Sequence, residues 1–568
     1  MATFTELTII FSFVFVVGLI FRVLKQPLII SYIFSGLILS QIFLNFSEKK
    51  SFVELFSDLG IAFLLFIVGL ELKLKTLREI GLPSIIIGFL QEFLTILAGF
   101  FILKFLLGFS LITSLYLAIA LSFSSTIIML KLITDKGDLE KLYGKLSVGF
   151  LLVQDLIAIL ILFAIPFFTT NIDDFFSFKN ASNILLAILS IILIPVISSK
   201  FMPKVEKFLE KSNEFLFLFS LFFALSISSL FKFLGFGLEA GALIAGVSLS
   251  SLSSNYEIAS RLRPLRDFFL ILFFILIGSN INLTTFNENL YATILLTLFV
   301  LIGNPLLMIL MLNPLGYSSK TSFLLGLTSA QISEFSFILI NQGIKLGYLD
   351  NEIISLLGLV GLISIFSSTY LFYYSEKVYL FFKPILKKLE KKKTISEISQ
   401  SKDYEYFLFG CDRIGYNFLK FFENQKDKFL IIDYNPEILE ILRKEGFNVI
   451  YGDAEDVEFL ETIDFSSAKI IISTIPDLAT NLIIAKEIKK QNVDAVFIYV
   501  AYNIDDALNL YSENADFVIL PHFLGGEYAI WIIKERGFNK KNYINLKEKE
   551  IVHLQQRKNI GHKYPHRL

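Results

Sequence analysis

The sequence has very few of the residues that build disulfides, cysteine metal sites and imidazole catalysis. Its one cysteine, Cys411, excludes an intrachain disulfide framework and a cysteine-based metal site. Its four histidines all lie after Pro521, so the long apolar part of the chain has no imidazole available. Charged residues are also scarce in the first two-thirds and concentrated in the last third. This change in composition predicts a domain boundary.

Apolar residues, in contrast, are abundant. A hydrophobic content of 54% and a mean hydropathy of +0.66 over 568 residues predict a polytopic membrane protein. The first apolar segment follows no basic region and precedes no small-residue cleavage site, so we expect a retained helix. The chain contains about thirteen candidate transmembrane helices, at 7–24, 27–45, 53–71, 83–107, 111–132, 146–165, 182–199, 213–231, 236–253, 264–281, 287–312, 317–342 and 353–375.

Basic residues in the short loops indicate how the chain is oriented. They gather in alternate loops, which the positive-inside rule makes cytoplasmic. The opposite loops carry Asp173, Asp174, Asp350 and Glu352, with Lys49 and Lys50 as exceptions. We therefore expect a protein of the cytoplasmic (inner) membrane with its N-terminus outside and its C-terminal domain in the cytoplasm. The cytoplasmic loops are marked by Arg22, Lys25, Lys73, Lys75, Arg78, Lys131, Lys136, Lys141, Lys145, Lys200, Lys204, Lys207, Lys211, Arg261, Arg263 and Arg266.

Asp155 lies in the middle of the sixth apolar segment, within the stretch LLVQDLIAIL at 151–160. An aspartate at the centre of a spanning helix costs about 2.5–3.5 kcal/mol on insertion scales, and such residues usually face a partner or a water-filled path. We interpret Asp155 as an ion or proton site. The alternative is a buried aspartate that neighbouring hydroxyls hold for packing alone.

Two other spans carry polar clusters near the membrane midplane. The fifth contains Ser122, Ser124, Ser125 and Thr126, and the twelfth contains the run AQISEFSFIL at 330–339, with Glu334. If spans 1–6 and 8–13 are inverted repeats joined by span 7, these two spans correspond. Interrupted helices at matching positions of two halves indicate a transporter binding site. The alternative is that the hydroxyls bond to the preceding turn of unbroken helices.

The composition divides the chain into a membrane domain at 1–382, a charged linker at 383–402, an α/β domain at 403–521 and a weakly patterned, basic tail at 522–568. In the α/β domain, YFLFGCDRIGYNFLKFF reads as a strand, a glycine-rich turn and a helix, and FLIIDYNPE as a second strand. Strands that alternate with helical stretches predict a parallel, doubly wound, Rossmann-like sheet.

The glycine-rich turn is the candidate nucleotide site of this domain. Asp412 occupies the middle position of G-x-G-x-x-G, where its side chain obstructs close backbone approach and its charge repels a phosphate. Asp433, at the end of the second strand, suits a ribose hydroxyl. We expect AMP to bind better than NAD(H), and no tightly bound cofactor; the alternative is a domain that only dimerises. The candidate residues are Gly410, Asp412, Arg413, Gly415, Asp433 and Asp453.

Taken together, these motifs resemble those of the Kef-type potassium/proton antiporters of the second monovalent cation:proton antiporter family, which carry an RCK (TrkA-N) regulatory domain. No single motif decides it, but their order and spacing are specific. The resemblance covers nearly the whole chain through FIVGLEL at 66–72, SST at 124–126, GKLSVGFLLVQD at 144–155, GLEAGALIAGVSLSS at 237–251, RPLRDFFLILFFILIG at 263–278, AQISEFSF at 330–337 and, in the α/β domain, GCDRIG, IDYNPE, YGDA, STIPD and PHFLGGE.

The resemblance implies an all-α membrane domain with inverted repeats and crossed discontinuous helices, in which a six-helix core moves against a dimerising scaffold. Gln154 and Asp155 match the family's Gln-Asp pair, and Ser124, Ser125 and Thr126 match its unwound crossover. Potassium or sodium and protons would be the substrates, with the monovalent cation at Asp155 and Glu334 as the next candidate. The implied partners are membrane lipid, a second copy of the chain and a small-molecule regulator, with no nucleic acid.

Two other classes of protein were weighed against an antiporter. A ligand-gated potassium channel should show a carbonyl filter such as TVGYG, which the sequence lacks. A membrane-tethered dehydrogenase needs a substrate domain with an acid–base group, and the region beyond Pro521 supplies no recognisable one. A non-enzymatic antiporter is therefore favoured, with potassium preferred and sodium left open. With Arg266 counted in the loop before the tenth span, no lysine or arginine lies deeper in that span, which predicts electroneutral exchange.

Overall fold

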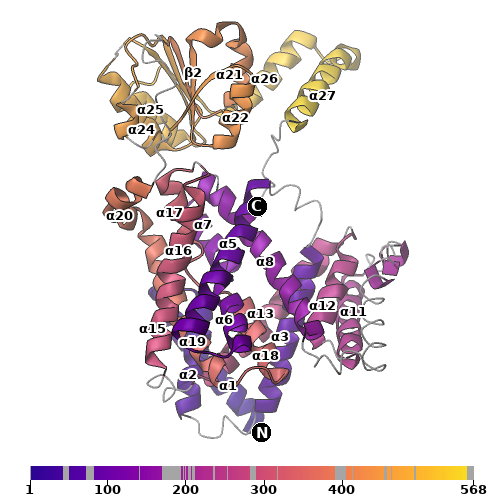
Figure 1. Cartoon of the computed structure of the whole chain (residues 1–568). Helices are drawn as coiled ribbons and strands as arrows, with labels where there is room; N and C mark the ends of the chain where they lie inside the picture. The colour runs from indigo at the N-terminus through magenta and orange to yellow at the C-terminus, as the bar shows by residue number, and fades with distance from the viewer. Residues whose placement is uncertain are drawn as a thin grey trace. The chain divides into compact units, whose positions relative to one another are not determined.

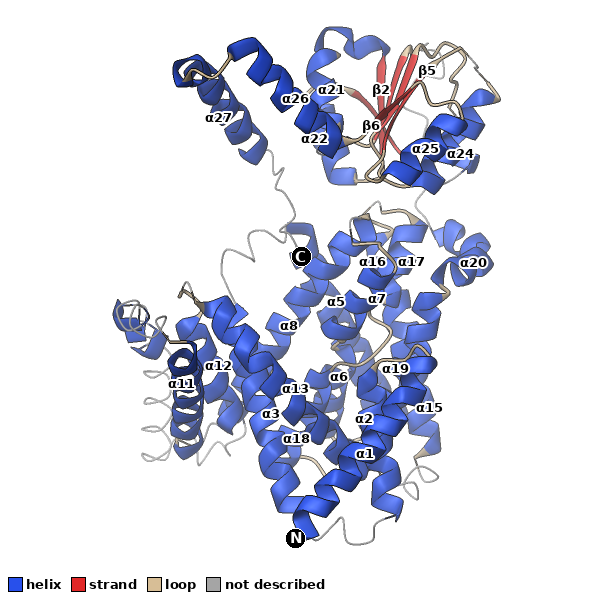
Figure 2. Ribbon diagram, turned by 180° about the vertical axis from the view of Figure 1, so that it is seen from behind, coloured by secondary structure: helices blue, strands red, loops and turns tan. Residues whose placement is uncertain are grey.

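The computed structural model covers a chain of two compact units (Figures 1 and 2). One consists of Met1–Leu312 and Ser319–Leu389, and the other of Asn313–Ser318 and Glu390–Leu568. We describe each unit by itself. The structure describes residues 2–42, 50–71, 82–139, 141–168, 193–195, 197–198, 200–202, 206, 212–234, 237–252, 254–281, 289–315, 317–389, 404–411, 414–452, 454, 457–461, 463–491 and 494–559.

In the described part of the first unit, all regular secondary structure is helical. Six of its described segments are long and apolar enough to cross a membrane, between Ser84 and Tyr373. Its helices are α1 (Ala2–Val23), α2 (Leu28–Ile42), α3 (Lys50–Glu71), α5 (Leu82–Phe101), η2 (Ile102–Leu106), α6 (Leu111–Ser122), α7 (Thr126–Asp135), α8 (Leu142–Phe168), α11 (Asn213–Phe233), α12 (Gly237–Leu249), α13 (Asn255–Ser279), α15 (Leu290–Leu298), η3 (Phe299–Gly303), α16 (Asn304–Leu312), α17 (Ser319–Leu327), α18 (Glu334–Lys345), α19 (Glu352–Tyr373) and α20 (Ser375–Leu389). The seventh expected span, 182–199, lies largely outside the described residues.

These helices form two packed groups. One group, the scaffold, contains α1, α2, α3, α11, α12 and α13, whose principal contacts are with one another. The other group, the core, contains α5, α6, α7, α8, α15, α16, α17, α18 and α19, again packed mainly among themselves. The core elements belong to the fourth, fifth, sixth, eleventh, twelfth and thirteenth expected spans. The described helices therefore divide as the resemblance implied.

Glycines allow the scaffold helices α2 and α13 to touch backbone to backbone. A methyl group on Gly36 of α2 would collide with the carbonyl oxygen of Ile275 in α13. Conversely, a methyl group on Gly278 of α13 would collide with the carbonyl oxygen of Ile33 in α2. This reciprocal contact leaves no room for side chains between the two helices. It is the small-residue packing by which membrane helices approach closely.

The second unit contains a six-stranded, fully parallel sheet in the order β3-β2-β1-β4-β5-β6. This is the doubly wound arrangement that the alternating strand and helix patterns predicted. Helices lie on both faces of the sheet (Figure 2). The elements are β1 (Tyr406–Phe409), α21 (Gly415–Phe421), η5 (Glu423–Lys428), β2 (Phe429–Asp433), α22 (Pro436–Lys444), β3 (Asn448–Tyr451), α23 (Val457–Leu460), β4 (Ile470–Ser473), α24 (Leu478–Lys489), β5 (Val496–Val500), α25 (Ile504–Ser512) and β6 (Phe517–Ile519).

The region expected to be a weakly patterned tail is largely helical. It forms α26 (Pro521–Arg536), η6 (Lys540–Tyr543) and α27 (Ile544–Asn559). Pro521 occupies the first turn of α26, where its missing N–H costs nothing, and Gly537 ends that helix at a φ of 65°. The sequence indicated only weak patterning for 522–559, and the helices of this region were not predicted from it. Capping residues define helices there although apolar periodicity is weak.

Candidate functional site

Two membrane segments of the core are interrupted at the positions where polar clusters predicted breaks. The fifth segment leaves the helix after Ser122, passes through an extended Phe123 and resumes at Thr126 as α7. The twelfth leaves the helix after Leu327 and resumes at Glu334 as α18. Each new helix begins after a serine, Ser125 or Ser333, whose hydroxyl accepts a backbone N–H. The predicted discontinuous helices are confirmed.

The two breaks are joined to each other by hydrogen bonds. Ser336 Oγ donates to the Ala120 carbonyl oxygen at 2.6 Å. Gln331 Nε2 lies 3.4 Å from the Ser125 carbonyl oxygen. The first bond supplies a donor to a carbonyl group in the last turn of α6, where intrahelical donors are missing. The Ser125 carbonyl oxygen also accepts the Met129 N–H of α7. The two bonds between the breaks fix α6, α7 and α18 at one crossing.

Asn304 connects the two breaks from a third segment. This residue is fully buried at the start of α16, directly after the π-helical turn η3. Its Nδ2 lies 3.1 Å from the Leu121 carbonyl oxygen and 3.4 Å from that of Ser329, so one amide reaches both broken helices. The sequence analysis did not identify Asn304. The signal in the sequence that could have identified Asn304 is its position as a polar residue in the middle of the apolar range 287–312.

Gln154 of α8 is held at the same crossing by several contacts. Its Oε1 accepts the Ser124 backbone N–H at 3.0 Å. Its Nε2 lies 2.6 Å from the Ser122 carbonyl oxygen, 3.0 Å from Glu92 Oε2 and 3.2 Å from Gln91 Oε1. The amide therefore ties α8 to the end of α6 and to α5. One lone pair of Oε1 is already engaged with the crossover backbone.

Glu92 is a buried carboxyl group that the sequence analysis did not identify. It is 2% exposed and lies on α5, close to the middle of the fourth expected span. Its Oε1 is hydrogen-bonded to Ser122 Oγ, and its Oε2 accepts from Gln154. The reasoning that identified Asp155, an acidic residue at membrane depth, applies equally to Glu92.

The two predicted carboxylates occupy different positions in the core. Asp155 follows Gln154 on α8 and is half-buried, whereas Gln154 is 1% exposed. Glu334 is the first residue of α18, is 7% exposed and lies with its Oε2 3.3 Å from Ser333 Oγ. Arg266 acts electrostatically on the Glu334 carboxyl. Asp155 and Glu334 thus lie on two different core helices, α8 and α18.

Arg266 lies further inside a helix than its sequence position suggested. Helix α13 begins at Asn255, so Arg266 is part of that helix rather than of a preceding loop. Its side chain is 17% exposed and forms an ion pair of 2.8 Å with Asp267. The premise that the tenth span carries no arginine was wrong, because the helix starts well before the apolar run.

Several buried oxygen atoms at the crossing have no hydrogen-bond partner among the described residues. These atoms are Ser124 Oγ, Thr126 Oγ1 and Asn304 Oδ1. Unpaired buried oxygens are uncommon in proteins and call for an explanation. Neutral oxygens can replace the hydration shell of a monovalent cation, as carbonyl oxygens do in potassium filters. Ser125, in contrast, uses its hydroxyl to accept the Ile128 N–H at 3.5 Å.

The second unit retains part of a nucleotide-binding turn. Gly410 has a φ of +81°, and a methyl group on Gly415 would collide with the Gly410 carbonyl oxygen. Both positions thus require glycine. The Asp433 carboxylate accepts the Cys411 N–H at 2.7 Å and the Asn435 N–H at 2.8 Å, so it fastens the turn to β2. Asp412, Arg413 and Asp453 lie outside the described residues.

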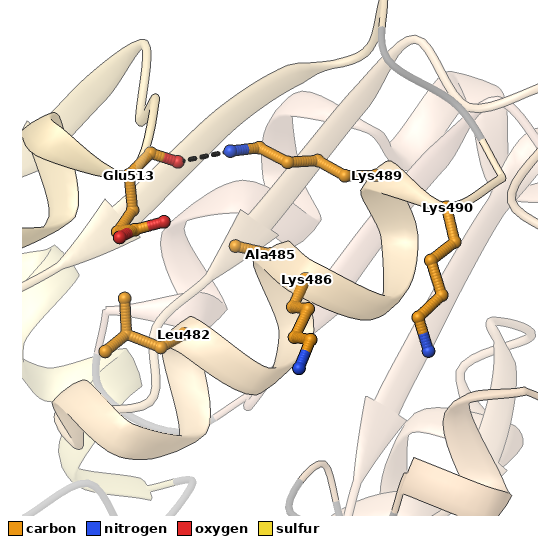
Figure 3. A pocket seen from close by; sticks show the side chains of 6 residues that line it. All are labelled: Leu482, Ala485, Lys486, Lys489, Lys490 and Glu513. Atoms are coloured by element: carbon orange, nitrogen blue, oxygen red, sulfur yellow. Dashed lines mark hydrogen bonds between the residues drawn. The ribbon is translucent and has the colours of Figure 1, made fainter.

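A cavity of about 420 Å³ in the same unit lies elsewhere (Figure 3). It is lined by Leu482, Ala485, Lys486, Lys489, Lys490 and Glu513. Helix α24 follows β4, so the C-terminal end of α24 lies at the amino ends of the parallel strands. The glycine turn lies at their carboxyl ends, where doubly wound folds bind nucleotides. Lys489 donates to the Glu513 carbonyl oxygen at 2.5 Å, and this cavity is separate from the turn.

Comparison with known proteins identifies the family of the membrane unit. Residues 10–373 match the family described as "Sodium/hydrogen exchanger, transmembrane". The chain belongs to the sodium/hydrogen exchanger family. Residues 406–521 of the chain match the TrkA-N domain, which agrees with the parallel sheet described above. The resemblance to Kef-type antiporters is therefore confirmed for family and domain composition.

Curated relatives of the chain are named as potassium transport proteins. "K(+) efflux antiporter 4" of Arabidopsis thaliana is 29% identical over 351 residues, which are 60% of this chain and 58% of the relative. "Glutathione-regulated potassium-efflux system protein KefC" of Escherichia coli (strain K12) is 25% identical over 490 residues, 85% of this chain and 77% of the relative. The chain thus spans about three-fifths of the plant relatives' length.

Among solved structures, the chain is similar to the sodium proton antiporter MjNhaP1 of Methanocaldococcus jannaschii. The identity is 16%, the alignment covers 66% of this chain and 97% of that protein, and the TM-score is 0.45.

Proposed function

We propose that this protein exchanges a monovalent cation, most readily potassium, for protons across the cytoplasmic membrane. The observation that carries the proposal is the crossing of two broken helices, where Ser124, Thr126 and Asn304 have unpaired buried oxygens. Gln154, which precedes Asp155 on α8, contacts this crossing directly. Potassium is preferred to sodium because the relatives are named as potassium transporters. A sodium/proton antiporter of the same fold is the second candidate.

Asp155 would bind the two substrates alternately. A single carboxylate can hold a proton or a partly dehydrated cation, so the two ligands compete for it. A protein that changes its access only when this site is occupied then exchanges one ligand for the other. The hydroxyls of Ser124 and Thr126 would add neutral oxygens to the cation. Gln154 would chiefly hold the backbone between α6 and α7 in place. The remaining lone pair of its Oε1 would be offered to the cation.

Transport by the purified protein in liposomes tests this proposal. Potassium and sodium gradients are applied separately while the internal pH is followed. We expect Asp155→Asn to abolish cation-driven pH change, because asparagine keeps the shape but loses both the titratable proton and the negative charge. Glu334→Gln should weaken exchange without abolishing it. Exchange at the wild-type rate by a correctly inserted Asp155→Asn protein would contradict the assignment of the site.

The TrkA-N unit is proposed to regulate exchange by binding a nucleotide at the Gly410–Gly415 turn. Any ligand there biases transport only if its affinity differs between active and inactive arrangements. Because the side chain and charge of Asp412 disfavour a pyrophosphate, we expect AMP to bind more tightly than NAD(H). Calorimetry should show that Asp412→Gly strengthens NAD binding. Equally tight NAD binding by the unaltered protein would refute the steric and charge argument.

A homodimer is proposed for the working protein, assembled through the membrane scaffold and the TrkA-N units. Helix α26 supports this proposal, because none of its described side chains is buried. Phe523, Tyr528, Ile530 and Trp531 are each more than half exposed on this helix. Exposed apolar side chains of this size, gathered on one helix, indicate a protein contact. The mass of the detergent-solubilised protein tests the assignment.

A further inference from the structure

Helix α20 follows the last membrane helix and is fixed to the core by one face. Ser375, Tyr379 and Leu386 are buried on this face. Lys136 Nζ donates to Ser375 Oγ at 2.6 Å, and Tyr379 Oη lies 3.2 Å from Ser319 Oγ of α17. The rings of Tyr379 and Phe323 are 5.8 Å apart. The helix is therefore part of the membrane unit and not a free extension of it.

A second face of α20 is apolar and uncovered. Phe381, Phe382 and Ile385 are 77%, 40% and 59% exposed, and Val378 is half-buried. Positions 378, 381, 382 and 385 follow the i, i+3, i+4, i+7 spacing that places side chains on one stripe of a helix. A stripe of this kind indicates a binding surface.

The charged residues in the sequence of α20 are predominantly basic. The helix contains Lys377, Lys383, Lys387 and Lys388 and a single acidic residue, Glu376. Glu376 lies 3.4 Å from Lys320 of α17, so its charge is already compensated by the core. The remaining charge is positive and complements an anionic surface. Helices that lie in the interface of a bilayer combine lysines with an apolar stripe that enters the membrane.

We propose that α20 lies in the headgroup layer of the membrane, with its apolar stripe at the acyl chains and its lysines on anionic lipid headgroups. Its position favours lipid over a protein partner. Helix α19, which is long enough to span the membrane, ends at Tyr373, and α20 begins at Ser375. Tyr373 and Tyr374 are each 48% exposed at this junction, where aromatic residues anchor spanning helices. The uncovered stripe is thus continuous with a lipid-facing surface.

The proposal adds a lipid-dependent step to the regulation of exchange. Helix α20 ends at Leu389, and the chain continues from there into the TrkA-N unit. A helix held in the leaflet moves less than a free linker, so the anionic lipid content of the membrane would alter the coupling between the two units. This consequence rests on the proposed function, whereas the location of α20 does not.

The single cysteine of the chain permits a direct test of this location in the full-length protein. In a Cys411→Ser background, whose monodisperse elution verifies folding, Phe381→Cys on the stripe and Glu376→Cys on the opposite side of the helix each receive a fluorophore. Vesicles contain phosphatidylcholine with or without phosphatidylglycerol. We expect nitroxide-labelled lipid to quench position 381 several-fold more than position 376, and water-soluble acrylamide to show the reverse order. Because quenching does not depend on transport, the measurement tests the location of α20 even if the protein shows no exchange.

Each other outcome counts against the proposal. Equal acrylamide quenching at both positions would place α20 in water. Protection of position 381 from both quenchers would mean that protein covers the stripe. For the charge argument, we expect phosphatidylglycerol to increase lipid quenching at position 381 at least twofold, and the double substitution Lys377→Gln, Lys383→Gln to remove this increase. An unchanged response to phosphatidylglycerol in the double variant would overturn the role of the lysines. In either case, loss of exchange by the unaltered protein would refute only the proposed function.

Discussion

At the scale of single residues, Glu92 shows how the site is held together. Its carboxyl group touches the Ser122 hydroxyl, which also lies 2.7 Å from the Ile119 carbonyl oxygen, and it accepts the Gln154 amide. Gln154 in turn holds the Ser124 backbone N–H. Glu92 therefore acts on the backbone between α6 and α7 through Gln154, which makes it a positioning residue.

Replacing Glu92 tests this role. In Glu92→Ala, Gln154 and Ser122 each lose one buried hydrogen bond, which costs about 0.5–1.5 kcal/mol per bond, while Gln154 Nε2 keeps the Ser122 carbonyl oxygen and Gln91 Oε1 as acceptors. We expect lower thermal stability and roughly tenfold slower exchange. Glu92→Gln keeps an oxygen for Gln154 and an amide for Ser122, so it should recover most of both. The apparent cation affinity and the maximal rate are measured separately in liposomes. Wild-type kinetics in Glu92→Ala would remove Glu92 from the site.

Sequence reasoning located some of these residues and missed others for a physical reason. Asp155 and Ser124 stand out because a charge or a serine cluster interrupts an apolar run. Glu92 and Asn304 interrupt their runs in the same way, yet their importance depends on what they contact. Asn304 Nδ2 reaches Leu121, far away in the sequence, and no local pattern specifies such a tertiary contact.

At the scale of elements, the breaks were predictable and the π-helical turns were not. Ser125 and Ser333 precede helices, and serine in this position is a readable capping signal. The turns η2 (Ile102–Leu106) and η3 (Phe299–Gly303) have sequences that would also suit a regular helix. Such turns arise from packing against neighbours, so sequence composition does not reveal them.

Glu405 provides a pH test of how the sheet of the second unit is assembled. Lys428 and Lys469, at the starts of β2 and β4, donate to its two carboxylate oxygens at 2.6 and 2.8 Å. These bonds lower the pKa of Glu405 from 4.5 to about 2. Because the folded pKa is depressed, its stabilising contribution is complete above pH 4.5 and is lost as the pH falls toward 2.

We therefore expect Glu405→Gln to lower the melting temperature of the TrkA-N unit at pH 7. The difference from wild type should shrink as the pH falls from 4.5 toward 2, because the wild-type carboxylate becomes protonated. Circular dichroism melts at several pH values measure this difference. Since both lysines are more than half exposed, added salt should reduce it. A difference that stays constant with pH would mean that the ion pairs contribute nothing.

At the scale of the whole molecule, the charge count predicts electroneutral exchange. Arg266 inside α13 adds a positive charge that the sequence analysis had placed in a loop. An arginine cannot be deprotonated in proteins, so it does not release a proton during a cycle as a lysine could. Asp155 then remains the residue that binds the cation and the proton alternately. One positive charge is therefore exchanged for one positive charge in each transport cycle.

An imposed membrane potential tests this stoichiometry. A cycle that moved net charge would gain about 2.3 kcal/mol per charge from 100 mV, which is readily visible in the final gradients. We expect the steady-state cation and pH gradients in liposomes to be insensitive to a potential set by the gradient of a permeant ion that the protein does not transport. A clear dependence on voltage would show that a second charged group takes part.

The division into two units was readable from the sequence, but its position was not. The change in composition placed the end of the membrane domain at 382, whereas α20 runs through this point to Leu389 within the membrane unit. A lysine-rich sequence resembles a soluble linker even when its apolar residues pack on the core. Burial of Tyr379 and Leu386, which depends on α17, decides the assignment.

The backbone contact between α2 and α13 bears on where the molecule can deform. No side chains lie between Gly36 and Ile275 or between Gly278 and Ile33, so this seam has no rotamers to exchange. Interlocked backbones of this kind yield little under load. The contact between scaffold and core at α2 and α19, in contrast, involves the apolar side chains of Ile30 and Ile365, which can change rotamer. We therefore expect deformation of the membrane unit along the contact between scaffold and core rather than at the seam between α2 and α13.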